Sequence, residues 1–154
     1  MEEKINKLYS LIDQTIKYGL DSNYSNRKSI SSLKKALVEI LFFHLDNEFE
    51  CDDINYPDIN RNQYSYIKEN LEMNFPDFGN FKNFKNISDL TNLEDVLIQN
   101  VILDLNDIII DLIEVKYRLQ NNGNFAGTDT FDFLFETGMK NKILNVINYL
   151  YNRD

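Results

Sequence analysis

The residues of this chain best able to do chemistry are carboxylates gathered in one segment. Asp104, Asp107, Asp111 and Glu114 follow one another at spacings of three, four and three residues. Each residue of an α-helix turns the chain by about 100°, so these side chains fall within about 80° of one another and form a single acidic ridge. Three interpretations fit the ridge: a solvated helix face, a surface that pairs with cations of other helices or of a partner, and a Mg²⁺ or Mn²⁺ site.

The residues around the middle of the acidic ridge favour an internal polar network. Asp107 and Asp111 alternate with isoleucines, so the helix has little fully exposed surface near them. A carboxylate that close to an apolar stripe normally needs a hydrogen-bond partner. We therefore expect partners from other helices, such as N-terminal cations, groups near Arg118 or tyrosine hydroxyls. Partner binding would be the second role of the ridge.

A second acidic pair makes the metal interpretation more specific. Glu69 and Glu72 lie on another predicted helix and could face Asp104 and Asp107. The arrangement resembles the Glu-x-x-Glu and Glu-x-x-Asp pattern of the all-α nucleoside triphosphate pyrophosphohydrolases. That resemblance implies a Mg²⁺-dependent enzyme that releases pyrophosphate. The chain departs from the pattern because Asp104 replaces a glutamate and no basic cluster follows to hold a triphosphate. We favour no metal, with Mg²⁺ at these four carboxylates as the alternative.

Other catalytic chemistry has little support in the sequence. The chain has a single histidine, His44, and a single cysteine, Cys51, which excludes an internal disulfide and any site that needs two histidines. Acidic neighbours should raise the pKa of Cys51 and make it a poor nucleophile. Neither a nucleophile elbow nor a glycine-rich phosphate loop occurs in the sequence. We therefore expect no catalytic residue.

The elements that carry these residues are predicted to be helices, because apolar residues recur at spacings of three and four through most of the chain. The spacing predicts helices over about 3–20, 31–48, 61–74 and 93–121, and a last one to Leu150. Ser31 or Ser32 is the expected cap of the second helix, and Thr128 or Thr130 that of the last. Residues 48–60 are predicted to be an acidic linker, and residues 75–85 a loop held by its phenylalanines. We predict an all-α fold, a bundle of five or six helices in a single domain over residues 1–154.

The long helix is expected to begin at a capping box, in which Thr91 and Glu94 each satisfy a backbone amide of the other. Its apolar stripe includes Leu97, and a break near Gln99 and Asn100 is possible because so long a helix would span the whole domain. The isoleucine run at 108–110 would suit a strand as well. Its place within a long helical period favours a helix.

The acidic ridge also resembles a known motif. Residues 104–112, with the sequence Asp-Leu-Asn-Asp-Ile-Ile-Ile-Asp-Leu, resemble the D-L-x-D-I-x-x-D-L signature of an uncharacterised bacterial all-helical family, a domain of unknown function. The resemblance extends over about residues 93–150 and implies an all-α fold. The family commonly carries Trp-Gly-x-His near its end, where this chain has Thr137 and Lys140 in place of the Trp and His. The family has no assigned activity, so the resemblance implies no reaction.

The charge of the chain points to the kind of partner. The net charge is −9, with −7 in residues 41–80, −4 in residues 81–154 and +2 in residues 1–40. This balance argues against binding to a nucleic-acid backbone or an anionic membrane, and the absence of a signal-like or spanning segment predicts a cytoplasmic protein. The leading hypothesis is a non-enzymatic interaction protein, such as an acidic immunity- or antitoxin-like protein, that binds a basic protein surface. The alternatives are the Mg²⁺-dependent enzyme and an oligomeric helical domain with the phenylalanine-rich loop as its interface.

Overall fold

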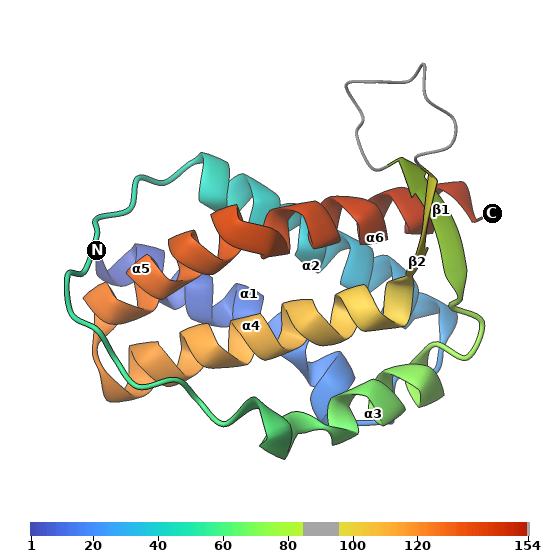
Figure 1. Ribbon diagram of the computed structural model, residues 1–154, viewed down its shortest axis with the longest axis horizontal. Coiled ribbons are helices and arrows are strands. Elements are labelled where there is room, and N and C mark those ends of the chain that lie inside the picture. The colour runs from blue at the N-terminus through green and yellow to red at the C-terminus, as the bar shows by residue number, and fades with distance from the viewer. Residues whose placement is uncertain (85–95, 154) are drawn as a thin grey trace.

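The computed structural model describes residues 1–84 and 96–153 (Figure 1). Its helices are α1 (Glu2–Leu20), α2 (Arg27–Leu45), α3 (Tyr66–Asn74), α4 (Val101–Asn121), α5 (Asn124–Leu134) and α6 (Lys140–Asn152). A short 3-10 helix, η1 (Arg61–Tyr64), precedes α3, and a π-helical turn, η2 (Phe135–Met139), joins α5 to α6 without a break. The predicted bundle of five or six helices is confirmed.

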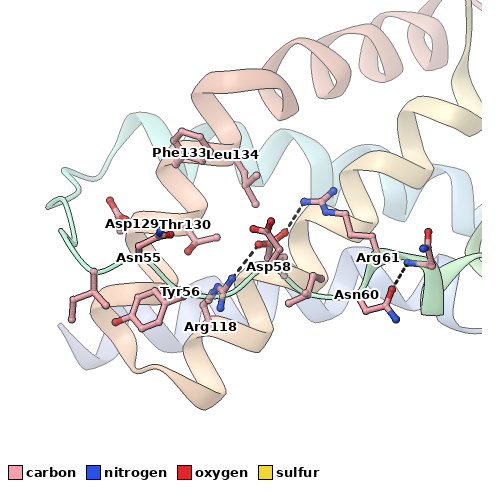
Figure 2. A pocket seen from close by; sticks show the side chains of 14 residues that line it. Asn55, Tyr56, Asp58, Asn60, Arg61, Arg118, Asp129, Thr130, Phe133 and Leu134 are labelled. Carbon is pink, nitrogen blue, oxygen red and sulfur yellow. Dashed lines mark hydrogen bonds and ion pairs between the residues drawn. The ribbon is translucent and has the colours of Figure 1, made fainter.

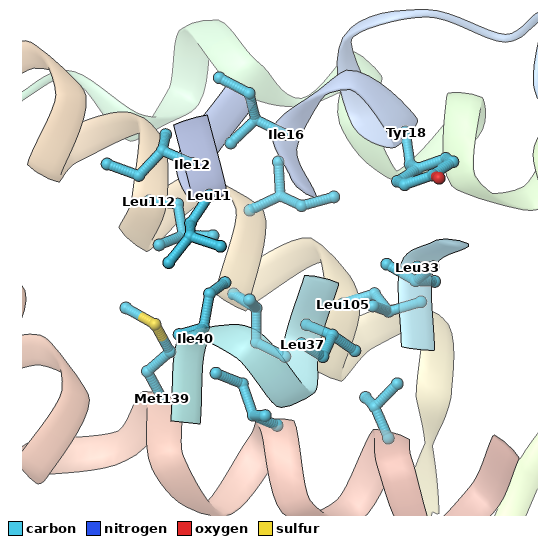
Figure 3. Packing of buried hydrophobic residues seen from close by; sticks show 14 of the residues in the cluster. Leu11, Ile12, Ile16, Tyr18, Leu33, Leu37, Ile40, Leu105, Leu112 and Met139 are labelled. Atoms are coloured by element: carbon cyan, nitrogen blue, oxygen red, sulfur yellow. The ribbon is translucent and has the colours of Figure 1, made fainter. Parts of the chain in front are cut away.

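Helix α4 lies at the centre of the bundle and contacts α1, α3, α5 and α6. Its stripe of Leu105, Ile108, Leu112 and Val115 is fully buried, as the helical spacing predicted. Figure 3 shows leucines and isoleucines of α1, α2 and α4 meeting in one apolar layer, which Met139 of η2 joins. Burial of this layer is the main stabilising contribution to the fold.

The predicted start of the long helix is wrong. Residues Val96–Asn100 form strand β2, which pairs antiparallel with β1 (Asn80–Phe84), and Asn80 lies opposite Asn100. The helix begins at Val101, because the side chain of Asn100 accepts hydrogen bonds from the amides of Ile102 and Leu103. The possible break near Gln99 is thus the real boundary. The capping box at Thr91 and Glu94 lies outside the described residues.

Two other predicted helix starts are also wrong. Helix α2 begins four residues before Ser31, with Asn26 as its cap, since the Asn26 side chain accepts from the Ser29 amide. Helix α5 begins at Asn124, directly after Gly123, whose φ of 101° separates it from α4. The Thr128 hydroxyl bonds to a carbonyl inside α5 and caps nothing.

Residues 46–60 connect α2 to η1 without regular secondary structure, and we call this segment the strap. It passes along the end of the bundle that holds the N-terminus and then beside α4 (Figure 1). Phe49 packs against the rings of Phe43, His44 and Phe131, which fixes the first half of the strap. The predicted linker is therefore an ordered cover.

Among the described residues, no helix is both long enough and apolar enough to cross a membrane.

Candidate functional site

The candidate site is a pocket of about 600 Å³ between the strap and helices α4 and α5. Strap residues 54–56 and 58–60 line one side, and Arg61 of η1 lines the end. Figure 2 shows Asp129 and Thr130 of α5 near Asn55 of the strap, with Arg118 and Arg61 further along it. We call this hollow the strap pocket.

The second half of the acidic ridge lies beside the strap pocket and is paired with Arg61. Nη1 of Arg61 donates to Oδ1 of Asp111 over 2.8 Å, and Nη2 donates to Oε2 of Glu114 over 2.6 Å. One planar guanidinium thus bridges two carboxylates one helical turn apart. Burial raises the pKa of Asp111, and the hydrogen bond and charge of Arg61 oppose that rise.

Arg118 links one of these carboxylates, Glu114, to the strap. Its Nη2 donates to the carbonyl oxygen of Pro57 over 2.6 Å and lies 3.5 Å from Oε1 of Glu114. The Arg118 side chain is buried, so its charge needs these acceptors. The result is a chain of contacts from α4 through Arg118 to the strap backbone, which holds the pocket in its present shape.

The first half of the acidic ridge faces α6 and does not reach the strap pocket. Oδ2 of Asp107 accepts from Nζ of Lys142 over 2.7 Å. Burial raises the pKa of Asp104 to about 6, and the charge of Asp107 adds to this rise, whereas Lys142 and a hydrogen bond from Asn145 oppose it. The acidic ridge therefore divides into two halves that face different elements. Lys142 of α6 pairs with the first half, and Arg61 of η1 pairs with the second.

The structure does not bring the alternative metal ligands together. Glu69 and Glu72 are exposed on α3, and Glu72 lies 3.7 Å from Lys68 on its own helix. Asp107 is paired with Lys142. Within residues 1–84 and 96–153, no group of three or more His, Cys, Asp or Glu side chains is placed to hold a metal ion.

The lone histidine forms a contact that sequence reasoning missed. Nε2 of His44 lies 2.7 Å from Oδ1 of Asp132 on α5, and its ring stacks between Phe49 and Phe135, with a centroid separation of 3.9 Å from Phe135. His44 therefore joins α2, the strap and the α5–η2 segment. No nucleophilic side chain is found beside it in the described contacts, so the pair acts as a clamp.

Cys51 is exposed on the strap. The negative charge of Asp129 on α5 raises its pKa, followed by smaller effects of burial and of Asp53. The predicted rise of the Cys51 pKa is confirmed in direction, but its largest cause is Asp129 of α5 and not a residue adjacent in sequence.

Arg61 is the residue that sequence analysis should have weighed more heavily. It is the only lysine or arginine between Lys35 and Lys68, and it follows directly on the acidic strap. A single cation after so many acids is a candidate for a fixed ion pair. Its partners lie 50 and 53 residues further along the chain, which no local pattern reveals.

Comparison with known proteins identifies a shared fold. No protein-family model matches the chain, and no curated protein matches it. Among solved structures, protein BF1032 from Bacteroides fragilis, a structural genomics target, is similar with a TM-score of 0.74. The alignment covers 98% of this chain and 92% of that chain, with 14% identical residues. At this identity the similarity extends to the helical fold alone.

Proposed function

We propose that the chain is a non-enzymatic cytoplasmic binding protein that uses the strap and the adjacent side of α5 to bind a basic surface of a partner protein. We call this region the strap face: residues 46–60 together with Asp129, Asp132, Phe133 and Glu136. The observation that carries the proposal is the strap pocket, in which acidic and apolar side chains meet on one exposed surface.

Negative charge is the first property that favours a basic partner. The strap contains six acidic residues and no lysine or arginine. Arg61 is held by Asp111 and Glu114, and Arg118 by Glu114 and the Pro57 carbonyl, so neither arginine pairs with a strap acid. Lys4 donates to the Glu48 carbonyl, and Lys140 pairs with Glu136, so these two lysines offset only part of the negative charge. The strap face therefore keeps a strongly negative field, which speeds association with a positive surface and discriminates against acidic ones.

Exposed apolar side chains supply the second property. Ile54 on the strap and Phe133 on α5 both line the strap pocket, and each is 62% exposed. Protein interfaces commonly combine an apolar centre with a polar rim, and large apolar anchors that enter a pocket contribute much of the affinity. An acidic rim around Ile54 and Phe133 has this composition, whereas a purely solubilising surface would not need the two apolar side chains.

An immunity- or antitoxin-like role is one case of this proposal, since such proteins neutralise basic partners by direct contact. We also propose that the chain is related to the helical family whose D-L-x-D-I-x-x-D-L signature residues 104–112 resemble. Asp107 and Asp111 of that run make ion pairs between elements. The run would then serve the fold and not a reaction.

The structure gives less support to the other two functions. The Mg²⁺-dependent enzyme requires Glu69 and Glu72 to lie beside Asp104 and Asp107. Among the described residues, these carboxylates do not form a group that could hold a metal ion. The oligomeric domain relied on the phenylalanine-rich segment as an interface. Phe75 and Phe78 are buried within the chain, so those rings are not free to bind a second copy.

Site-specific crosslinking tests the proposal. A photoreactive amino acid at Ile54 or Phe133 should trap one protein from an extract of the source cells, and the same group at Met73, an exposed apolar position on α3, should not. With the trapped protein purified, Phe133→Asp should weaken binding at least tenfold, Met73→Asp should leave it unchanged, and added salt should slow association. Equal crosslinking from Met73, or full affinity of Phe133→Asp, would reject the proposal.

A further inference from the structure

A second hollow, of about 610 Å³, lies at the opposite end of the molecule from the strap. The start of α2, the turn after α3 and the end of α6 surround it, near the C-terminus in Figure 1. Arg27, Lys34 and Arg153 all line this hollow, which we call the basic pocket. Three cations around one cavity are unexpected in a chain whose net charge is −9.

None of the three cations makes an ion pair with a described residue. Nζ of Lys34 lies 4.1 Å above the ring of Tyr151, and the guanidinium carbon of Arg153 lies 4.9 Å from the ring centre of Phe78. Aromatic faces hold such groups in place without removing their charge. By contrast, Lys35, the neighbour of Lys34 on the outside of α2, is paired with Glu39.

One nitrogen of Arg153 lacks a partner although it is buried. Nη1 of Arg153 is out of contact with water and has no hydrogen-bond partner among the described residues. This nitrogen is closed off from solvent, so a ligand in the hollow would meet the parts of the half-buried Arg153 side chain that line the pocket. Asp77 also lines the basic pocket, so its wall carries three basic side chains and one acidic side chain, and this excess of positive charge favours an anionic ligand.

The backbone adds to this preference. Helix α2 points its N-terminal end toward the basic pocket, and its cap, Asn26, uses its side chain on the Ser29 amide. The other first-turn amides of this 19-residue helix add partial positive charge. The C-terminal end of α6 lies nearby with the opposite partial charge, and Arg153 at its C-cap offsets that charge.

We propose that the basic pocket binds the phosphate group of a small organic phosphate. A phosphate dianion supplies several acceptors for Arg153, Arg27 and Lys34 at once, which a single carboxylate cannot do. The hollow is larger than an inorganic phosphate ion needs. Its apolar wall, which includes Pro76 and Phe78, offers a surface for an organic group attached to the phosphate. This inference concerns a different part of the chain from the strap face and does not depend on the function proposed there.

Calorimetric titration with inorganic phosphate and with phenyl phosphate tests the inference. We expect saturable binding of one phenyl phosphate per chain at low salt, and at least tenfold weaker binding of inorganic phosphate, because the ring uses the apolar wall. Equal affinities would identify free phosphate as the ligand and overturn the organic part of the proposal. A dissociation constant of 10 millimolar corresponds to a free energy of binding of about −3 kcal/mol. If neither probe bound saturably up to about this concentration, the whole inference would be overturned.

Matched variants locate the binding. Arg153→Gln and Lys34→Gln should each weaken phenyl phosphate binding at least tenfold, whereas Lys35→Gln removes the same charge from the same helix and should change nothing. If Lys35→Gln weakened binding as much as Lys34→Gln, the affinity would come from overall charge and the inference would be wrong. Circular dichroism checks that each variant is folded. If Arg153→Gln does not fold, the result for Lys34→Gln alone decides whether the basic pocket binds phenyl phosphate.

Discussion

Replacement of Arg61 by methionine removes the only cation that contacts Asp111 directly among the described residues. Arg61→Met keeps most of the aliphatic part of the side chain but leaves the Asp111 carboxylate without its cation. The Asp111 side chain is only 11% exposed. Glu114 retains Arg118 at 3.5 Å, so Asp111 bears most of the loss. We therefore expect the substitution to destabilise the fold at pH 7 far more than the loss of a surface charge would.

Two independent arguments set the size of the effect. Opposite charges about 4 Å apart attract by roughly 4 kcal/mol at an effective dielectric constant near 20. Arg61 is 43% exposed, so water screens part of this attraction, and we expect a loss of about 2–3 kcal/mol. Alternatively, Asp111 can take up a proton. With an ordinary pKa of 3.8, protonation at pH 7 costs at most about 4 kcal/mol, which is the upper limit of the effect.

The cost of protonating Asp111 depends on pH, so the predicted loss of stability does too. At pH 5 this upper limit falls to about 1.5 kcal/mol, so the penalty of Arg61→Met must shrink on acidification. Urea denaturation at pH 7 and pH 5, compared with wild type at each pH, measures both values. The control is Lys68→Met, which removes an exposed ion pair with Glu72 and should cost less than about 0.5 kcal/mol at either pH.

The result that would refute this reasoning is a penalty at pH 7 no larger than that of Lys68→Met. A penalty that stays constant between pH 7 and pH 5 would refute the electrostatic cause and leave lost packing by the Arg61 stem as the explanation.

Two further substitutions test other parts of the structure. Burial raises the pKa of Asp104 to about 6, so the folded state binds its proton more tightly than the unfolded state and loses this stabilisation as pH rises from about 4 to 6. Asp104 is only partly buried, so Asp104→Asn should raise stability at pH 7 by about 1 kcal/mol and have little effect at pH 4; an equal effect in urea melts at both pH values would contradict this cause. A Cβ on Gly127 would lie 2.3 Å from the Leu119 side chain and 3.0 Å from its Cα, so Gly127→Ala should destabilise by about 1–3 kcal/mol. Gly138→Ala, where nothing lies within 4 Å, should be neutral or slightly stabilising, and a thermal melt in which both variants behave alike would show that the close α4–α5 contact is not limiting.

Helix bodies were predictable from the sequence because apolar spacing records which side of a helix is buried. The stripe of α4 from Leu105 to Val115 appears in the structure as predicted. Helix starts were less predictable, because the chain is rich in asparagine, serine and threonine and offers several possible caps at each one. At α2 the side chain of Asn26 caps the helix, whereas the sequence pattern predicts Ser31 or Ser32.

The sheet could not be predicted from local pattern alone. Residues 96–98 are apolar and continue the helical period of α4, yet they pair with β1. Their state depends on a strand that ends twelve residues earlier in the chain. The ion pairs of the candidate site have the same limitation. The ridge itself was visible as four spaced carboxylates, but its cations, Arg61 and Lys142, come from elements that only the folded chain brings near.

The positions of the strap face and the basic pocket give the molecule a permanent dipole moment. The first part of the acidic strap lies at one end of the longest axis, and the start of α2 and the end of α6, which carry the three cations of the basic pocket, lie toward the other end (Figure 1). In the field of a positively charged protein, this dipole exerts a torque that turns the strap end forward before contact, over a distance of about one Debye length, roughly 8 Å at physiological ionic strength. With the partner proposed above bound at the strap face, the basic pocket would point away from it, and the two proposed sites could be occupied at the same time.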